Sequence, residues 1–138
     1  MAYLLDTCAL SDGSKSQPSP HLLAWLESRP EEERYVSVLS MGEIMFGIFR
    51  LPAGRKRRFL SKWYDGVLRP IYAERVLPFG EREAMVWANL RGLYPNCDPI
   101  DAQIAATAIA HNLTLVTRNE KDFAVEGLSL VNPWDSEC

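Results

Sequence analysis

Short apolar runs alternate along this chain with longer segments whose apolar residues recur at helical spacing, and this alternation constrains the fold most strongly. The runs predicted as buried strands are Ala2–Leu5, Tyr35–Leu39, Arg75–Pro78, Leu113–Thr117 and Leu128–Val131. The segments predicted as helices are His21–Ser28, Ser40–Arg50, Ala53–Leu68, Gly80–Leu93 and Pro99–His111. A repeated strand-then-helix order favours an α/β domain with a mostly parallel central sheet and right-handed crossovers.

The size and charge of the chain narrow its class. Its 138 residues suit a single domain spanning 1–138 that can bury one core. A net charge of -3 argues against holding nucleic acid by bulk electrostatics alone. The chain has no apolar run of the length that a membrane span needs, so we expect a cytoplasmic protein. The widely spaced cysteines Cys8, Cys97 and Cys138 are expected to be free thiols.

Carboxylates recur where the predicted strands end. Asp6 follows the first strand, Glu43 the second and Asp122 the fourth, while Asp101 lies early in the last helix. Because the carboxyl ends of parallel strands meet at one edge of a sheet, these side chains can face one cleft. Neighbouring carboxylates repel unless a cation compensates them, and all-oxygen ligands suit Mg²⁺, with Mn²⁺ as a substitute. The pattern indicates a metal centre that activates water at a phosphate.

Several of these acids also have a purely structural explanation. Ser40 and Glu43 have the spacing of a capping box, and Asp98 before Pro99 would cap a helix and make Asp101 a favourable first-turn acid. Asp122 would be a first-turn acid behind an Asn119 cap. Asp6 has no capping role unless a helix begins immediately after it. The residue pattern alone leaves these alternatives open.

One segment is strongly basic. Arg55, Arg58 and Lys62 recur at i, i+3 and i+7, which gives a cationic stripe on a predicted helix beside an apolar stripe that contains Phe59 and Trp63. An ordinary amphipathic helix explains the pattern. If the stripe flanks the acidic cleft, it would hold an RNA backbone that the carboxylates repel.

Four blocks of sequence resemble the PIN-domain family, and within it the VapC-type toxins of bacterial toxin-antitoxin pairs. The blocks run in the family's order over nearly the whole chain: Leu4-Leu5-Asp6-Thr7, Ser37 to Ile44 with Gly47, Ile100 to Ala108, and Leu115 to Asn119 with Asp122-Phe123. The resemblance implies a three-layer α/β/α fold and a magnesium-dependent ribonuclease that cleaves single-stranded RNA and arrests translation.

The resemblance also implies roles for individual residues. Asp6, Glu43 and Asp101 match the family's most characteristic acids, and Asp122 matches a more variable fourth acid. The accessory polar positions are Thr7, Thr117 and Asn119. The implied partners are a cognate antitoxin, whose C-terminal segment blocks the acidic groove, and a second copy of the chain in a homodimer.

Two alternatives remain at this level. A PIN-like domain without catalytic activity would bind RNA or a protein partner only. A receiver-like phosphoacceptor domain also pairs an α/β sheet with an aspartate and magnesium, but receivers carry an acidic pair after the first strand and Lys-Pro after the last. This chain has the single Asp6 and Asn132-Pro133 at those places.

Overall fold

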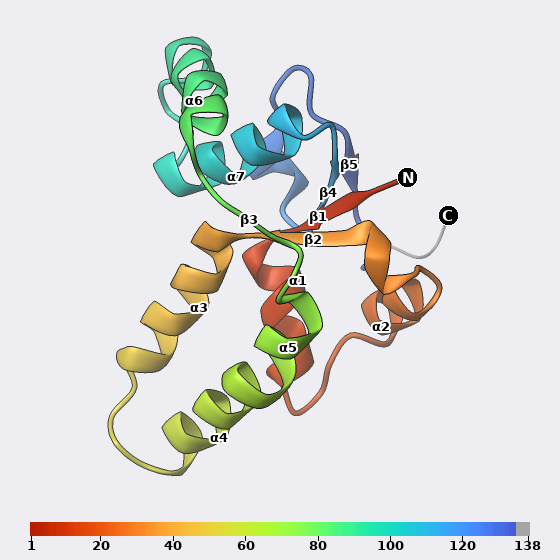
Figure 1. Cartoon of the computed structure of the whole chain (residues 1–138), viewed down its shortest axis with the longest axis vertical. Helices are drawn as coiled ribbons and strands as arrows, with labels where there is room; N and C mark the ends of the chain where they lie inside the picture. The colour runs from red at the N-terminus through yellow and green to blue at the C-terminus, as the bar shows by residue number, and fades with distance from the viewer. Residues whose placement is uncertain (135–138) are drawn as a thin grey trace.

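The computed structural model describes residues 1–134 and is built around a five-stranded, all-parallel sheet with the order β3-β2-β1-β4-β5 (Figure 1). The strands are β1 (Tyr3–Leu5), β2 (Arg34–Ser37), β3 (Val76–Leu77), β4 (Thr114–Val116) and β5 (Leu130–Val131). The predicted parallel α/β fold is confirmed. Cys138, predicted as a free thiol, lies outside the described residues, whereas Cys8 and Cys97 are free as predicted.

The strand order places a topological switch point at the centre of the sheet. The chain moves outward from β1 through β2 to β3, then returns to pair β4 with the other edge of β1 and continues to β5. Ligand sites of open parallel sheets lie at such a point, outside the carboxyl ends of the strands. Asp6 and Thr117 directly follow β1 and β4, so both lie there.

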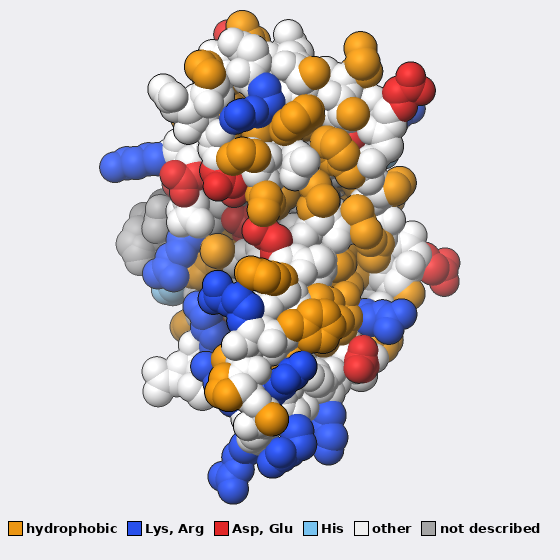
Figure 2. Space-filling view, turned by 90° about the vertical axis from the view of Figure 1, so that its left-hand side faces the viewer, with side chains coloured by type: hydrophobic (Ala, Val, Ile, Leu, Met, Phe, Trp, Pro, Cys, Tyr) orange, Lys and Arg blue, Asp and Glu red, His pale blue; other side chains and the backbone are white. Residues whose placement is uncertain are grey.

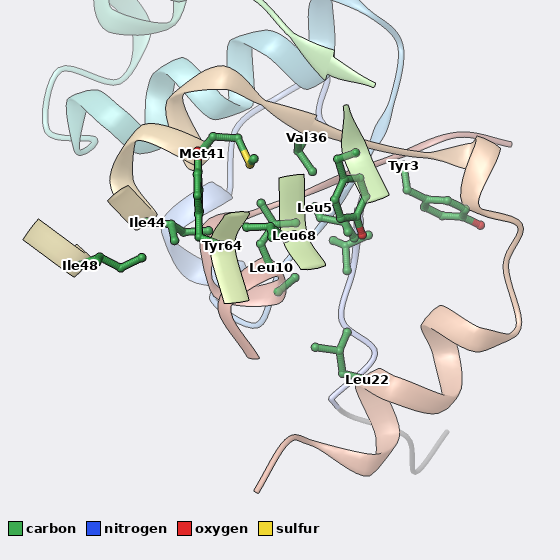
Figure 3. Close-up of a cluster of buried hydrophobic side chains, with 13 residues drawn as sticks. Tyr3, Leu5, Leu10, Leu22, Val36, Met41, Ile44, Ile48, Tyr64 and Leu68 are labelled. Carbon is green, nitrogen blue, oxygen red and sulfur yellow. The ribbon is translucent and has the colours of Figure 1, made fainter. Parts of the chain in front are cut away.

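Helices cover both faces of the sheet, as Figure 1 shows. One face bears α1 (Thr7–Ser11), α2 (Pro20–Glu27), α3 (Val38–Phe49), α4 (Arg55–Trp63) and α5 (Arg69–Tyr72), and the other bears α6 (Glu81–Leu93) and α7 (Pro99–Ala110). Successive side chains of β1 therefore enter different cores: Tyr3 and Leu5 pack with Val36 on the α1–α5 side (Figure 3), and Leu4 packs against α7. The predicted three-layer α/β/α arrangement is confirmed.

The helix boundaries differ from prediction at two places. The second strand ends at Ser37 because the Ser37 side chain caps α3 by accepting a hydrogen bond from Leu39 N–H, 3.0 Å away. The single helix predicted over residues 53–68 is instead α4 followed by a π-helical turn, Tyr64–Leu68, and the short α5, which contains Pro70. The π-turn buries both Tyr64 and Leu68 against the core.

The α6 and α7 helices form a closely packed pair. Glu83, buried in the first turn of α6, accepts a hydrogen bond from Gly80 N–H at 2.8 Å and contacts His111 Nε2 at the end of α7. Burial raises the pKa of Glu83, but the hydrogen bonds to its carboxylate outweigh this effect and leave that pKa below the usual value. None of the helices within residues 1–134 has the length and apolar character that crossing a membrane requires.

Candidate active site

Asp6 lies at the centre of the carboxyl edge of the sheet and is almost fully buried, with 3% of its surface exposed. It caps α1, because its Oδ1 accepts a hydrogen bond from Ala9 N–H at 2.8 Å. The sequence offered a capping role only if a helix began immediately, and α1 does begin at Thr7. The cap accounts for one carboxylate oxygen and fixes the direction in which Asp6 points.

The electrostatic state of Asp6 reflects two opposing influences. Burial raises its pKa, while hydrogen bonds from the Thr117 side chain and the backbone of Ala9 and Cys8 lower it, and the Glu43 charge raises it again. Burial dominates, so the pKa of Asp6 is raised overall. Thr117 is itself fully buried, and its Oγ1 accepts a hydrogen bond from Asn119 N–H at 3.0 Å. Thr117, at the end of β4, thus helps the α1 cap to hold the Asp6 carboxylate in place.

Glu43 lies in the second turn of α3 rather than directly at the end of β2. The predicted capping box is wrong, because α3 begins earlier, at Val38, and Ser40 is buried inside the helix with no hydrogen-bond partner for its hydroxyl within the described chain. Glu43 instead accepts a hydrogen bond from Thr7 Oγ1 at 2.6 Å. This bond joins residues from α1 and α3, so Glu43 has a specific partner beside Asp6.

Asp101 approaches from the other layer of the molecule. The predicted cap of α7 is confirmed, since Asp98 Oδ1 accepts hydrogen bonds from Ile100 N–H at 2.9 Å and Asp101 N–H at 3.0 Å. The face of α7 that contains Ile104, one turn after Asp101, is buried as expected. Partial burial raises the pKa of Asp101 to about 6, and the nearby charges of Asp98, Asp122, Glu43 and Asp6 raise it in that order.

The influences on Asp101 show which acids lie together. Glu43 and Asp6 reach it across the switch point, and Asp98 and Asp122 lie on its outer side. Asp98 is the acid that sequence reasoning missed, because its capping role accounted for it fully. The signal available was its position three residues before Asp101, one helical turn away.

Asp122 occupies an exposed 3-10 turn, Glu120–Phe123, six residues beyond β4. The predicted Asn119 side-chain cap of this turn is wrong: only the Asn119 carbonyl accepts a bond, from Asp122 N–H at 3.0 Å. The Asn119 side-chain amide points elsewhere, toward Cys8 Sγ, 3.7 Å away. Thr7, Thr117 and Asn119 therefore all lie around the acids, with Asn119 bordering the exposed thiol of Cys8.

Two hollows flank the acids. The first, about 560 Å³, lies against Asp98, Asp101 and Asp122. The second, about 330 Å³, contains Thr7 and Glu43 in its wall. Figure 2 shows acidic side chains in the middle of one face of the molecule, with Lys and Arg side chains gathered toward the end formed by α4.

The predicted cationic stripe is exposed on α4, but the basic residue of α4 that lines the second hollow is not part of that stripe. Lys56 lines it, together with the apolar residues Leu60 and Trp63. Arg58 and Lys62 line a separate hollow with Gly54 instead. Of the predicted apolar pair, Trp63 packs against the core, whereas Phe59 is 57% exposed. The contact of Arg55, Arg58 and Lys62 with RNA stays a prediction.

The donor chemistry of this site suits a hard divalent cation. Asp6, Glu43 and Asp101 supply carboxylate oxygens only. Burial and, to a smaller extent, neighbouring acidic charge raise the pKa of Asp6 and of Asp101, and a bound cation would stabilise their charged forms. Within residues 1–134, however, no three Asp, Glu, His or Cys side chains converge on one ion position. Mg²⁺ is commonly bound through one or two carboxylates while keeping several waters, so the residues present fit a water-bridged ion.

Comparison with known proteins identifies relatives that share this sequence and fold. A protein of Sinorhizobium fredii named VapC ribonuclease Y4jK is 33% identical over 136 residues, covering 96% of this chain and 97% of that protein. The crystal structure of FitAcB from Neisseria gonorrhoeae matches with a TM-score of 0.90 at 33% identity, covering 96% of this chain and 99% of the other. A toxin-antitoxin complex from Klebsiella pneumoniae matches with a TM-score of 0.72 at 27% identity, over 96% and 98% of the two chains.

The sequence model of the PIN domain matches residues 3–126, a range that begins at β1 and includes every acid described above. Sequence similarity over nearly the full length and a shared fold agree. The chain therefore belongs to the PIN-domain family, with relatives among the VapC ribonucleases and toxin-antitoxin proteins.

Proposed function

We propose that this protein is a magnesium-dependent ribonuclease, the toxin of a toxin-antitoxin pair, which hydrolyses RNA phosphodiester bonds in the cytoplasm and thereby arrests translation. The observation that carries the proposal is the meeting of Asp6, Glu43 and Asp101, from three separate elements, at the switch point of the sheet. The name of the relative Y4jK supports the substrate class.

In this proposal, each residue has a role that follows from its position in the site. Asp6 is oriented by the α1 cap on its Oδ1 and by the hydrogen bond from Thr117, so its carboxylate has a fixed direction for holding a ligand. Thr7 orients Glu43 in the same way. Asp101, with Asp122 beside it, approaches from the opposite side of the site. A bound Mg²⁺, or Mn²⁺ in its place, would supply charge stabilisation at the phosphate and a water of lowered pKa.

The accessory positions have matching roles in this proposal. Thr117 holds Asp6 and receives the Asn119 backbone N–H, so it positions the centre of the site. Asn119 lies at its rim, where a side-chain amide can orient a water or a phosphate oxygen. Asp122 is exposed and acts on Asp101 through its charge, which suits an outer contributor rather than a central ligand.

We infer two protein partners in addition to RNA. The relative from Klebsiella pneumoniae was solved as a toxin-antitoxin complex, which supports a cognate antitoxin for this chain. An antitoxin arginine would match the acidic groove, because guanidinium pairs with carboxylates in bidentate geometry. A homodimer remains part of the proposal, and sedimentation of the purified chain alone and with its antitoxin would measure both assemblies.

Two other functions are less well supported. A receiver-like domain is disfavoured by the sheet, whose order β3-β2-β1-β4-β5 differs from the 2-1-3-4-5 order of receivers. A PIN domain that only binds RNA or protein would retain the fold but would not need carboxylates from several elements close enough to act on one another. The proposed enzyme and this binding module differ in whether RNA is cut.

The test is cleavage of single-stranded RNA by the purified chain with Mg²⁺ and with EDTA. We expect cleavage only with the metal, and a loss on the order of 100-fold in Asp6→Asn, which keeps the helix cap but removes a charged ligand. Asp65→Asn is the matched control, because Asp65 is an exposed acid paired with Arg69 and absent from the charges that act on Asp6 or Asp101. Equal cleavage by wild type and Asp6→Asn would refute the assignment.

A further inference from the structure

Two neighbouring hollows form one continuous trough that begins at the candidate active site. The hollow of about 330 Å³ starts at Thr7 and Glu43, and the next, about 730 Å³, extends to Lys15 and Phe59. Both hollows share the same four lining residues, Ser11, Ser14, Lys56 and Leu60, so the α1 end and α4 form common walls. We call this feature, running from Glu43 to Phe59, the α4 trough.

The trough ends in a region of uncompensated positive charge. The α4 helix, Arg55–Trp63, contains five cationic side chains and no acid, in a chain whose net charge is -3. Lys56, which lines both hollows, forms no ion pair with any residue of the 1–134 range. Lys15 adds a second cation, partly neutralised by Asp12, 3.4 Å away. The basic end of the molecule in Figure 2 is this region.

An exposed aromatic ring lies next to these cations. Phe59 follows Lys56 by one helical turn and keeps 57% of its surface exposed, although Leu60 and Trp63 on the adjoining face pack against the core. Within the described residues, no aromatic ring or guanidinium stacks on Phe59. A large apolar ring left open beside the unpaired Lys56 is suited to receive a flat, partly apolar group attached to an anion.

We propose that the α4 trough binds the single-stranded RNA segment adjoining the cleaved phosphate, with Lys56 contacting a backbone phosphate and Phe59 stacking on a base. The inference rests on the proposed ribonuclease function and names the path of its substrate. Single-stranded nucleic acids are held by cations that follow the backbone and aromatic rings that stack on unpaired bases. The hydroxyls of Ser11 and Ser14 on the α1 side donate to backbone carbonyls, so their oxygens can accept a hydrogen bond from a sugar hydroxyl.

Charge decides between RNA and a peptide as the occupant. A protein segment that also reached the acids would have to be basic there and acidic farther along the trough, beside Lys56 and Lys15, whereas every nucleotide of RNA carries the same negative charge. RNA meets the opposite situation, since its phosphates are attracted by the trough and are repelled at the acids unless a cation is bound. The trough thus compensates the repulsion that the site itself imposes on its substrate.

The test measures RNA binding separately from cleavage. A fluorescein-labelled single-stranded oligoribonucleotide is titrated in EDTA, and its anisotropy is followed at several salt concentrations. Phe59→Ala should weaken binding on the order of 10-fold, Phe59→Trp should retain it, and Phe59→Leu should behave like alanine, because stacking requires a flat ring. Lys56→Gln should reduce the salt dependence of log Kd by about 0.7.

Arg82→Gln is the control for total charge, because Arg82 is an exposed cation on α6, in the opposite layer. Unchanged affinity for the oligoribonucleotide in Phe59→Ala and Lys56→Gln would overturn the proposal and would favour a protein segment as the ligand of the trough. A loss in Arg82→Gln equal to that in Lys56→Gln would also overturn it, since only bulk charge would then matter. Trough-dependent binding without any cleavage in Mg²⁺ would instead refute the ribonuclease assignment while keeping the path.

Discussion

The acids of the candidate site fall into two groups that are held in opposite ways. The sheet-side group, Asp6 and Glu43, is tied by hydrogen bonds from Ala9, Thr117 and Thr7. The α7-side group, Asp98, Asp101 and Asp122, is more exposed. No residue of the described chain donates a hydrogen bond to the Asp101 carboxylate.

This difference means that one group of acids is fixed in orientation, while the other contributes mainly negative charge. The sheet-side group has its geometry set by folding, because its partners are backbone groups and hydroxyls of the surrounding elements. In the α7-side group, partial burial of Asp101 and, after it, repulsion from the neighbouring negative charges of Asp98 and Asp122 raise the pKa of Asp101 to about 6. A cation would relieve this repulsion, so we expect the α7 side to respond to metal and the sheet side to stay fixed.

The largest effect should come from removing one central acid of each group. Asp6→Asn and Asp101→Asn should each lower the rate of RNA cleavage by about 100-fold or more, because in the proposed mechanism both acids would hold the same ion. The double variant should then be little worse than either single variant, as residues that act as a unit are not additive. Initial rates at saturating Mg²⁺ measure this. Multiplicative losses would mean that the two groups work independently and do not act as one unit.

A smaller effect should follow from loosening the sheet-side group without removing charge. Thr7→Val keeps the shape of the side chain but deletes the hydrogen bond to Glu43, and we expect about a 10-fold loss of activity. Thr114→Val is the matched control, because Thr114 lies on β4 at the amino end of the sheet, opposite Tyr3. A loss of the same size in both variants would show that the threonine acts through folding rather than through Glu43.

The capping role of Asp6 gives the next prediction. Asp6→Ala should lower the free energy of unfolding by about 1 kcal/mol relative to Asp6→Asn, since asparagine still accepts the Ala9 N–H bond and alanine does not. Both variants lack the charge, so their difference isolates the cap. Urea denaturation of the metal-free proteins measures it. Equal stabilities would mean that the cap does not orient the sheet-side group.

These two groups also explain how far the sequence could predict the site. Alternation of strands and helices predicts the parallel sheet. Strand ends and helix starts are local signals that mark Asp6 and Asp101 as candidates, but the choice between a capping role and a metal-binding role for Asp101 depends on the family resemblance. The capping assignment of Ser40 failed, since Ser37 one turn earlier was an equally good cap and only packing decided between them. Asp98 and Lys56 were missed as site residues because their roles depend on which elements meet across the switch point.

The smallest effect is a pH dependence carried by the α7-side group in metal-free protein. The pKa of Asp101 is raised from 3.8 to about 6 in the folded state, so its protonated form stabilises the fold below about pH 4 and this contribution is lost as the pH rises through 6. Because the group is partly exposed and screened, we expect less than about 1 kcal/mol. Thermal unfolding between pH 4 and 7 in EDTA measures the slope.

Asp101→Asn should flatten that slope, and so should saturating Mg²⁺, since the ion stabilises the charged form. Glu83 provides an internal contrast of opposite sign. The hydrogen bonds that lower the pKa of its carboxyl contribute stability that is lost only as the pH falls below its usual value of 4.5. The two contributions therefore occupy different pH windows. If the pH dependence of stability above pH 5 persists in Asp101→Asn, it comes from another titratable group. The α7-side group would then not differ from the sheet-side group in its response to pH.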